Sequence, residues 1–269
     1  MNKKLCAALF TVLVLTFSIY AQQEADFIVT LTDDGEGAII KKYTGTAAVV
    51  RIPAAIQEMP IHEIGEEAFF NNTTITSVVI PAGVKKIVRA AFSGCLKLTS
   101  VTIPEGLESI GDSAFLNCTA LSAITLPQSL KTLGVAAFRK SGITAVTIPA
   151  GITEFLLNSY DNNSAFSDCT KLRTITLSEG MKTIPGGIFW GCTALTTIAL
   201  PASITRIDQN AFRDCTALTT ITIPDAVEKI LFASVEKSWL DDDREFQGCI
   251  KLTLASQAAL RKRGYTGKF

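Results

Sequence analysis

The stretch Leu98–Cys118, LTSVTIPEGLESIGDSAFLNC, decides the fold because close copies of it fill residues 51–254. Most copies have a proline at the end of a short apolar run, Ser178 takes this position in one copy, and Pro81, Pro104 and Pro127 are 23 residues apart. A phenylalanine follows this position by 11 residues in five copies: Phe92, Phe115, Phe138, Phe189 and Phe212. Self-similarity at a fixed period of about 20–30 residues predicts a solenoid.

One copy shows why the chain coils. Val101 and Ile103 alternate with polar residues, which is the period of a strand with one buried face. Pro104 lacks a backbone donor and ends that strand, and Gly111 marks a turn before Phe115 returns to the interior. One coil alone cannot bury these side chains. Coils stacked about 4.8 Å apart can, and each buried phenylalanine contributes roughly 1.5–3 kcal/mol.

A small residue stands three positions after each phenylalanine, and in six copies it is a cysteine: Cys95, Cys118, Cys169, Cys192, Cys215 and Cys249. Asn72 and Ser141 fill the same position elsewhere. Export favours disulfides, but in-register coils hold neighbouring Cβ atoms about 4.8 Å apart, whereas a disulfide needs about 3.8 Å. A line of single cysteines also gives no tetrahedral metal set. We therefore expect buried thiols that act as small hydrophobic residues.

The repeat I-P-x-x-[LVI]-x-x-I-x-x-x-A-F-x-x-C-x-x-L-x-x-[IV]-x-[IL]-P resembles the BspA-type class of bacterial leucine-rich repeats over residues 46–254, as about eight repeats. The resemblance implies a curved solenoid with a parallel β-sheet on its concave side. Short strands, turns or 3-10 segments are implied for the convex side. It also implies an exported bacterial protein, of a class in which several members are surface antigens or adhesins.

The two ends of the chain differ from the repeat. Residues 1–21 have the pattern of a signal peptide, with two lysines before an apolar run that is short for a membrane span; a retained amphiphilic anchor is the alternative. Cys6 precedes that run, which argues against a lipid anchor. Residues 22–45 predict a β-hairpin cap around the turn 33–37, because apolar residues alternate on either side. The expected location is secreted or at the cell surface, with the periplasm as an alternative.

Residues 255–269 predict a C-terminal helical cap, with Ser256 as the N-cap and Gly264 as the C-cap. Its basic residues 261–263 lie near the negative end of the helix dipole, which explains them without a ligand. The competing interpretation is a patch that binds nucleic acid or lipid. No membrane span is expected in the mature chain.

Three arcs are longer than the repeat, at residues 53–64, 155–166 and 230–246. The last two insertions leave the coil at the same place in the repeat, so we expect them on one side. They supply Tyr160, Phe232 and Trp239 as candidate anchors for a partner, because aromatic residues dominate binding hot spots. The alternative is that these rings fold back onto the convex side.

Composition excludes several classes of function. Removal of residues 1–21 would leave 23 basic and 25 acidic residues, a formal net charge of 23 − 25 = −2. A protein without excess positive charge is a poor candidate for nucleic acid. His62 is the sole histidine, so no histidine metal cluster or catalytic pair can form. The consecutive acids 241–243 lack the alternating spacing of a calcium loop. We expect no enzyme activity, no metal and no cofactor.

The solvent-facing strand positions are small, uncharged and often threonine. They form our candidate partner-binding face, and the threonines that carry the prediction are Thr102, Thr125, Thr147, Thr176 and Thr222. The alternative is β-propensity on an ordinary exposed sheet. A threonine lattice also resembles ice-binding solenoids, but a curved sheet with alanine breaks disfavours that function. The leading hypothesis is an exported, non-enzymatic protein that binds a protein or glycan, in adhesion to host or neighbouring cells. A self-associating envelope protein is the alternative, and a hydrolase is third.

Overall fold

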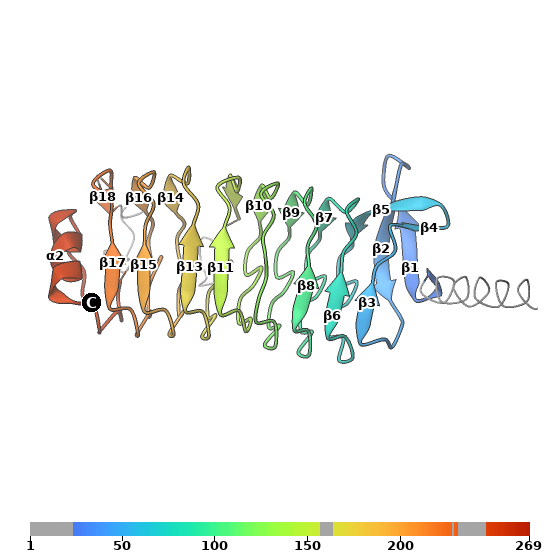
Figure 1. Ribbon diagram of the computed structural model, residues 1–269, viewed down its shortest axis with the longest axis horizontal. Coiled ribbons are helices and arrows are strands. Elements are labelled where there is room, and N and C mark those ends of the chain that lie inside the picture. Colours follow the sequence, from blue (N-terminus) through green and yellow to red (C-terminus); the bar gives the residue numbers. More distant parts are fainter. Residues whose placement is uncertain (1–23, 157–163, 228, 231–245) are drawn as a thin grey trace, which may run out of the picture.

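The structure is a computed structural model that describes residues 24–156, 164–227, 229–230 and 246–269. It is a β-solenoid in which successive coils stack along one long axis (Figure 1). Most coils contribute one strand to each of two rows of mainly parallel strands. The predicted leucine-rich repeat fold, with a hairpin cap and a C-terminal helix, is confirmed. The predicted signal peptide lies outside the described residues.

The first row, which we call the threonine sheet, contains the strand that precedes each proline position. Its strands are β3 (Val49–Arg51), β6 (Ser77–Val79), β8 (Ser100–Thr102), β11 (Ala145–Ile148), β13 (Thr174–Leu177), β15 (Thr197–Ala199) and β17 (Thr220–Thr222). Within each paired group the strands are parallel and in register, so that Val78 lies beside Val101 and Thr147 beside Thr176. The ladder is interrupted between β13 and β15. Between β8 and β11 the row continues through isolated bridges at Ala123.

The second row, the arc sheet, contains the short strands that follow the proline positions. Its strands are β5 (Met59–Ile64), β7 (Lys86–Ile87), β9 (Ser109–Ile110), β10 (Thr132–Leu133), β12 (Glu154–Phe155), β14 (Thr183–Ile184), β16 (Arg206–Ile207) and β18 (Lys229–Ile230). Two-residue strands suffice here because the inner ones pair in register with the coil before and after, as β9 does with β7 and β10. The row is interrupted between β12 and β14.

A column of stacked aromatic rings runs along the interior. It consists of Tyr43, Phe69, Phe92, Phe115, Phe138, Phe166, Phe189, Phe212 and Phe246, with neighbouring ring centroids 4.7–6.2 Å apart. Phe115 is fully buried, and its ring lies 5.1 Å from those of Phe92 and Phe138. The backbone amide of Phe115 also donates to the Ala137 carbonyl of the next coil. Each coil is therefore completed by its neighbours, as the repeat predicted.

The six repeat cysteines are buried free thiols. Each thiol donates to the carbonyl of the phenylalanine one coil earlier, as Cys118 Sγ does to Phe92 at 3.1 Å. Ser141, which replaces cysteine in one coil, is buried and lies 3.4 Å from Cys169 Sγ. The cysteine position therefore satisfies a buried carbonyl as well as filling space, which the sequence did not predict.

The N-terminal cap is a hairpin of β1 (Phe27–Leu31) and β2 (Ala38–Tyr43), and β2 pairs in parallel with β5. The longer first arc holds a second hairpin, in which β4 (Ala55–Ile56) pairs with β5. Its turn residues Gln57 and Glu58 both have positive φ, the conformation of a tight primed turn. These residues account for part of the extra length predicted between residues 53 and 64.

The C-terminal cap is helix α2 (Leu254–Lys262), which lies over the end of the threonine sheet (Figure 1). The predicted N-cap at Ser256 is wrong: Thr253 is the N-cap, and its side chain accepts from the Ser256 amide. The C-cap is Arg263, and the predicted Gly264 follows it with φ +91°. The backbone amide of Thr253 still donates to the Thr219 carbonyl of the preceding coil. The helix can begin only after this residue, and Thr253 therefore becomes its N-cap.

Across the described parts of the chain, no helix combines the length and the apolar character needed to cross a bilayer.

Candidate functional site: the threonine face

The outward side of the threonine sheet is an exposed surface that we call the threonine face. Arg51 of β3 is exposed at its N-terminal end, and the strands from β6 to β17 turn uncharged side chains outward. Its core consists of twelve exposed positions in six coils: Ser100, Thr102, Ala123, Thr125, Ala145, Thr147, Thr174, Thr176, Thr197, Ala199, Thr220 and Thr222. The residues between them, such as Val101 and Val146, point inward and are buried. This alternation holds hydroxyl and methyl groups outward in two regular columns.

Charged side chains pair instead across the coils of the arc sheet. Lys86 Nζ lies 3.1 Å from the Glu63 carboxylate, and Lys131 Nζ lies 2.7 Å from that of Glu108. These pairs are exposed and contribute little stability, since surface ion pairs are worth about 0–1 kcal/mol. The two rows of strands thus present surfaces of different chemistry.

The threonine face is hollowed near its centre. The hollow has a volume of about 220 Å³ and is lined by Ile124, Thr125, Ala145, Val146, Thr147, Thr174 and Thr176. It lies where Ala123 and Ala145 replace the larger residues of neighbouring coils and where the ladder narrows to isolated bridges. The coil that ends at Pro149 is one residue shorter than its neighbours. A Cβ at Gly142 in that coil would lie 2.3 Å from the Thr119 carbonyl oxygen, so the shortened turn needs glycine.

The structure brings three of the predicted site residues together, because Thr125, Thr147 and Thr176 all line the hollow. Thr102 and Thr222 are exposed on the same face, in coils on either side of it. The predicted aromatic anchors Tyr160, Phe232 and Trp239 lie outside the described residues. Thr174, which the sequence places on the same face but not among the candidate residues, also lines the hollow, and the inward residues Ile124 and Val146 lie at its base. The one-residue shortening between Pro127 and Pro149 was the available signal of the hollow.

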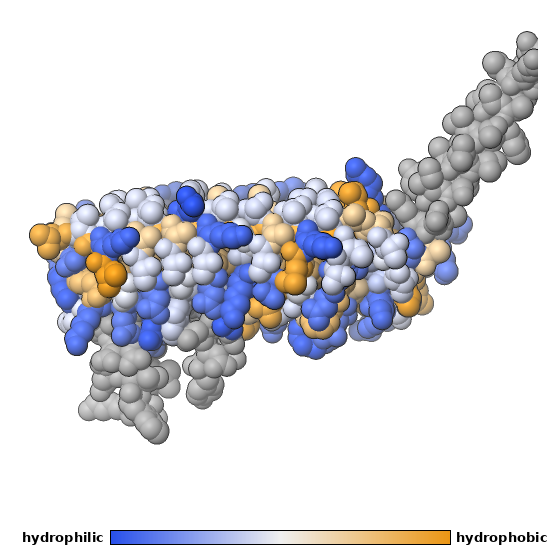
Figure 2. All heavy atoms as spheres, turned by 90° about the horizontal axis from the view of Figure 1, so that it is seen from below, coloured by the Kyte–Doolittle hydropathy of each residue, from blue (hydrophilic) through white to orange (hydrophobic). Residues whose placement is uncertain are grey.

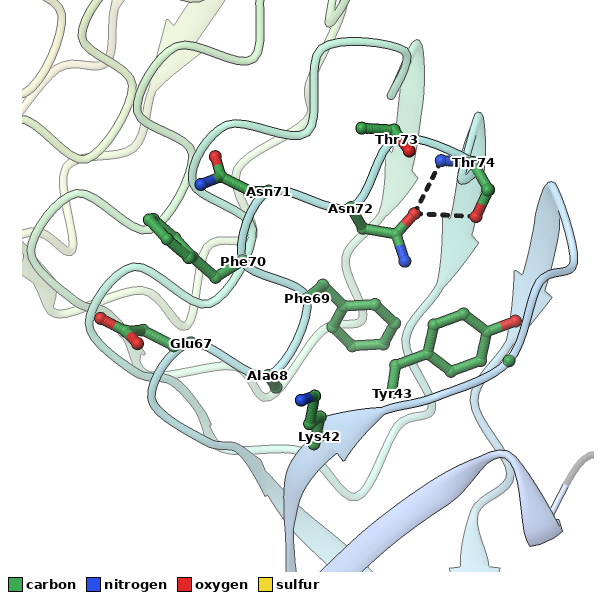
Figure 3. Close-up of a pocket in the computed structure, with 11 residues that line it drawn as sticks. Lys42, Tyr43, Glu67, Ala68, Phe69, Phe70, Asn71, Asn72, Thr73 and Thr74 are labelled. Carbon is green, nitrogen blue, oxygen red and sulfur yellow. Dashed lines mark hydrogen bonds between the residues drawn. The ribbon is translucent and has the colours of Figure 1, made fainter.

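A second hollow, of about 300 Å³, lies at the N-terminal end of the solenoid and was not predicted. Figure 3 shows the rings of Tyr43 and Phe69 side by side at this site, with Phe70 pointing away from them. Asn72 Oδ1 accepts from the Thr74 amide and hydroxyl, so this side chain closes the first turn in place of a cysteine. The hollow exists because β2 ends at Tyr43, before it could cover the whole first coil.

Comparison with known proteins agrees with this geometry. The model of the BspA type leucine rich repeat region (six copies) matches residues 52–165 and 162–242. The chain belongs to the BspA-type leucine-rich repeat family. A search of curated proteins gives no match.

Two solved structures resemble this BspA-type protein. One is the T. pallidum leucine rich repeat protein TpLRR, with 26% identity and a TM-score of 0.64, covering 91% of this chain and 96% of that protein. The other is a leucine-rich repeat protein from Bacteroides ovatus ATCC 8483, with 29% identity and a TM-score of 0.66. The second match covers 76% of this chain and 54% of that protein, so the BspA-type chain spans about half its length.

The titratable side chains of this BspA-type solenoid are poorly placed for catalysis. Burial raises the pKa of the Cys95 and Cys249 thiols to about 12, so they remain protonated and unreactive near neutral pH. His62 lies in β5, on the arc sheet, where its ring packs against Gly37 of the cap. Within the described residues, no three histidine, cysteine or acidic side chains form a group that could hold a metal ion.

Proposed function

We propose that this protein is an exported, non-enzymatic binding protein that holds a protein partner on the threonine face. The observation that carries the proposal is the hollow at the centre of an exposed and uncharged sheet. A binding surface with few charges loses little free energy when its water is removed. The parallel strands also hold the hydroxyl groups in fixed positions, which lowers the entropy cost of binding.

The dimensions of the hollow favour a protein over a small molecule. Ligand pockets usually measure about 300–1,000 Å³, and this hollow measures about 220 Å³. Ile124 and Val146 lie at the base of the hollow but are buried, so the methyl and hydroxyl groups of the threonines around it would make most of the contact with one side chain of a larger partner. The remaining threonines would then contact the surface around that anchor.

The extracellular location and a role in adhesion to host or neighbouring cells are part of the proposal. They are supported by the signal-peptide pattern of residues 1–21 and by membership in the BspA-type family. The two insertions that contain Tyr160, Phe232 and Trp239 would add contacts to the same partner.

Arrayed extracellular-matrix proteins and glycans test this function. We expect the protein to bind a protein on the array, and Thr147→Arg to weaken that binding at least tenfold, because the larger cation would fill the hollow. Thr153→Arg is the matched control, since Thr153 is also exposed but precedes β12 of the arc sheet. Equal binding by the two variants would exclude the hollow. Binding to glycans alone would overturn the choice of a protein partner.

A variant with both insertions cut to the regular repeat length separates the loops from the sheet. Loss of binding in this variant with normal folding would assign contacts to the insertions. Unchanged binding would remove Tyr160, Phe232 and Trp239 from the site.

A further inference from the structure

Exposed apolar side chains gather at the two ends of the solenoid. Six of the eight large apolar residues that are exposed in the described chain lie there, four at the N-terminal end and two at the C-terminal end: Ile28, Leu31, Val49, Phe70, Ile250 and Leu254. Leu254 is 83% exposed and Ile250 is 71% exposed. Figure 2 shows apolar groups near each end of the rod and further apolar groups on the side between them. Exposed large apolar side chains are therefore more frequent at the two ends of the described solenoid than along its sides.

The N-terminal end has a strand edge that no described strand covers. Strand β1 pairs with β2, and the Thr32 amide donates to the Gly37 carbonyl. Because antiparallel residues alternate between inward and outward bonding, the backbone groups of Val29 and Leu31 point away from β2. Strand β1 contains no charged residue that would discourage pairing or packing at this edge.

The C-terminal end is covered by α2, whose inner side replaces a strand. Ser256 and Leu260 are buried, and Ser256 Oγ accepts from the Ile221 amide at 3.3 Å. The outer side of the helix carries Leu254, Ala258 and Arg261, at the i, i+4 and i+7 spacing of one helical face, and all three are exposed. This face is small and apolar at its start and positively charged at its end.

The charges of the two ends are opposite. Residues 24–43 contain two lysines and five acids, a formal net charge of −3, and Asp33 and Glu36 are exposed in the hairpin turn. Residues 250–269 contain five basic residues and no acid, a formal net charge of +5. Arg263 is paired with Asp225 at 2.8 Å, but Lys251, Lys262 and Lys268 are exposed. The caps are thus complementary in charge as well as apolar.

We propose that the protein associates head to tail with copies of itself, the outer face of α2 in one copy packing against the β1–β2 hairpin of the next. Opposite charges align the ends, and the helix covers the open edge of β1, which is a common way to protect a sheet edge. The contact is heterologous, so it can repeat without closing. Such an array would place many threonine faces in a row and strengthen binding through multivalency.

Sedimentation velocity with charge-reversed variants tests this arrangement. One variant carries Lys251→Glu, Lys262→Glu and Lys268→Glu, and the other carries Asp33→Lys and Glu36→Lys. These side chains are exposed, and Asp34 is left unchanged because its carboxylate accepts from Thr32 and Glu36 in the turn. We expect the unaltered protein to sediment faster as its concentration rises, with association at least tenfold weaker in 500 mM than in 50 mM salt.

Each variant alone should remain monomeric, because its two ends now carry like charges. An equimolar mixture should associate again, because the unaltered C-terminal end of one variant meets the unaltered N-terminal end of the other, and the two reversed ends also carry opposite charges. Reversal of two exposed lysines in the middle of the solenoid, Lys97→Glu with Lys182→Glu, is the matched control and should leave association unchanged. Circular dichroism would verify that every variant is folded.

Three results would overturn the proposal. The first is a monomeric unaltered protein up to about 1 mM in low salt. The second is self-association of either variant as strong as that of the unaltered protein, which would point to contacts between like ends or elsewhere. The third is a mixture of two folded variants that stays monomeric. None of these results depends on whether the threonine face binds a partner.

Discussion

Replacement of Phe115 by alanine removes one ring from the middle of the aromatic column. The side chain is fully buried, and its ring stacks at 5.1 Å on Phe92 and at 5.1 Å on Phe138. Loss of a buried phenylalanine costs about 3–5 kcal/mol, and each aromatic pair adds about 0.5–1.5 kcal/mol beyond burial. We expect the free energy of unfolding to fall by about 4–5 kcal/mol, a large share of the roughly 5–15 kcal/mol of a typical domain.

Guanidinium chloride unfolding, followed by far-UV circular dichroism, measures this loss. Phe115→Leu keeps most of the volume but loses both ring contacts, so it should cost about 1–3 kcal/mol. Leu116→Ala, at the half-buried neighbouring position, should cost about 1 kcal/mol or less. Because coils contact mainly their neighbours, the alanine variant should also unfold less cooperatively. Equal stabilities of Phe115→Ala and Leu116→Ala would refute the role of the column.

Three further predictions concern the thiols, the helical cap and the shortened coil. Burial raises the pKa of the Cys169 thiol to about 11, whereas the thiol of the unfolded chain titrates near 8.5. Above pH 8.5 the unfolded state therefore loses this proton first. The free energy of unfolding should be unchanged below pH 8.5 and fall by roughly 3 kcal/mol as the pH rises to 11. Cys169→Ser should lack this part of the loss in unfolding experiments between pH 7.5 and 11, and identical pH profiles would contradict the assignment. Ser256→Ala should lower the free energy of unfolding by about 1–3 kcal/mol by leaving the Ile221 amide without its acceptor, whereas Gln257→Ala, at a half-buried neighbour, is the control and should cost less. Gly142→Ala should lower the melting temperature more than Gly83→Ala. The new Cβ would lie 2.3 Å from a backbone oxygen at position 142 and 3.2 Å from one at position 83. A larger loss in Gly83→Ala would exclude the tight turn as the reason for glycine at position 142.

Periodicity was enough to predict which residues face the interior. Phe92, Phe115 and Phe212 recur at a constant distance from the proline position, and an in-register stack has one place for them. The same reasoning predicted the outward threonines, because strands alternate their side chains. Long-range order in this chain follows from a local pattern that is repeated many times.

The departures from the repeat could be located but not described from sequence. The first long arc forms a hairpin because Gln57 and Glu58 adopt positive φ, which is uncommon for residues other than glycine. The sequence predicts Ser256 as the N-cap of α2, whereas the N-cap is Thr253; both residue types are good caps. The choice depends on a bond between Thr253 and the preceding coil.

The candidate site was predicted in part. The threonines at the hollow were named, but the hollow itself depends on two alanines and one missing residue acting together in neighbouring coils. Its floor of Ile124 and Val146 could not be assigned, because inward strand residues are expected to be covered. The opposite net charges of residues 24–43 and 250–269 can be counted in the sequence. They suggest an association only once the structure shows that these residues form the two ends of a rod.

Nuclear Overhauser contacts between phenylalanine rings test the stacking of coils most directly. With selectively labelled rings, Phe115 should show contacts to both Phe92 and Phe138, whose centroids lie 5.1 Å away on either side. Phe92 and Phe138 should show none to each other, because the ring of Phe115 lies between them. A direct Phe92–Phe138 contact, or absence of either contact to Phe115, would contradict the solenoid on which the proposed face and ends depend.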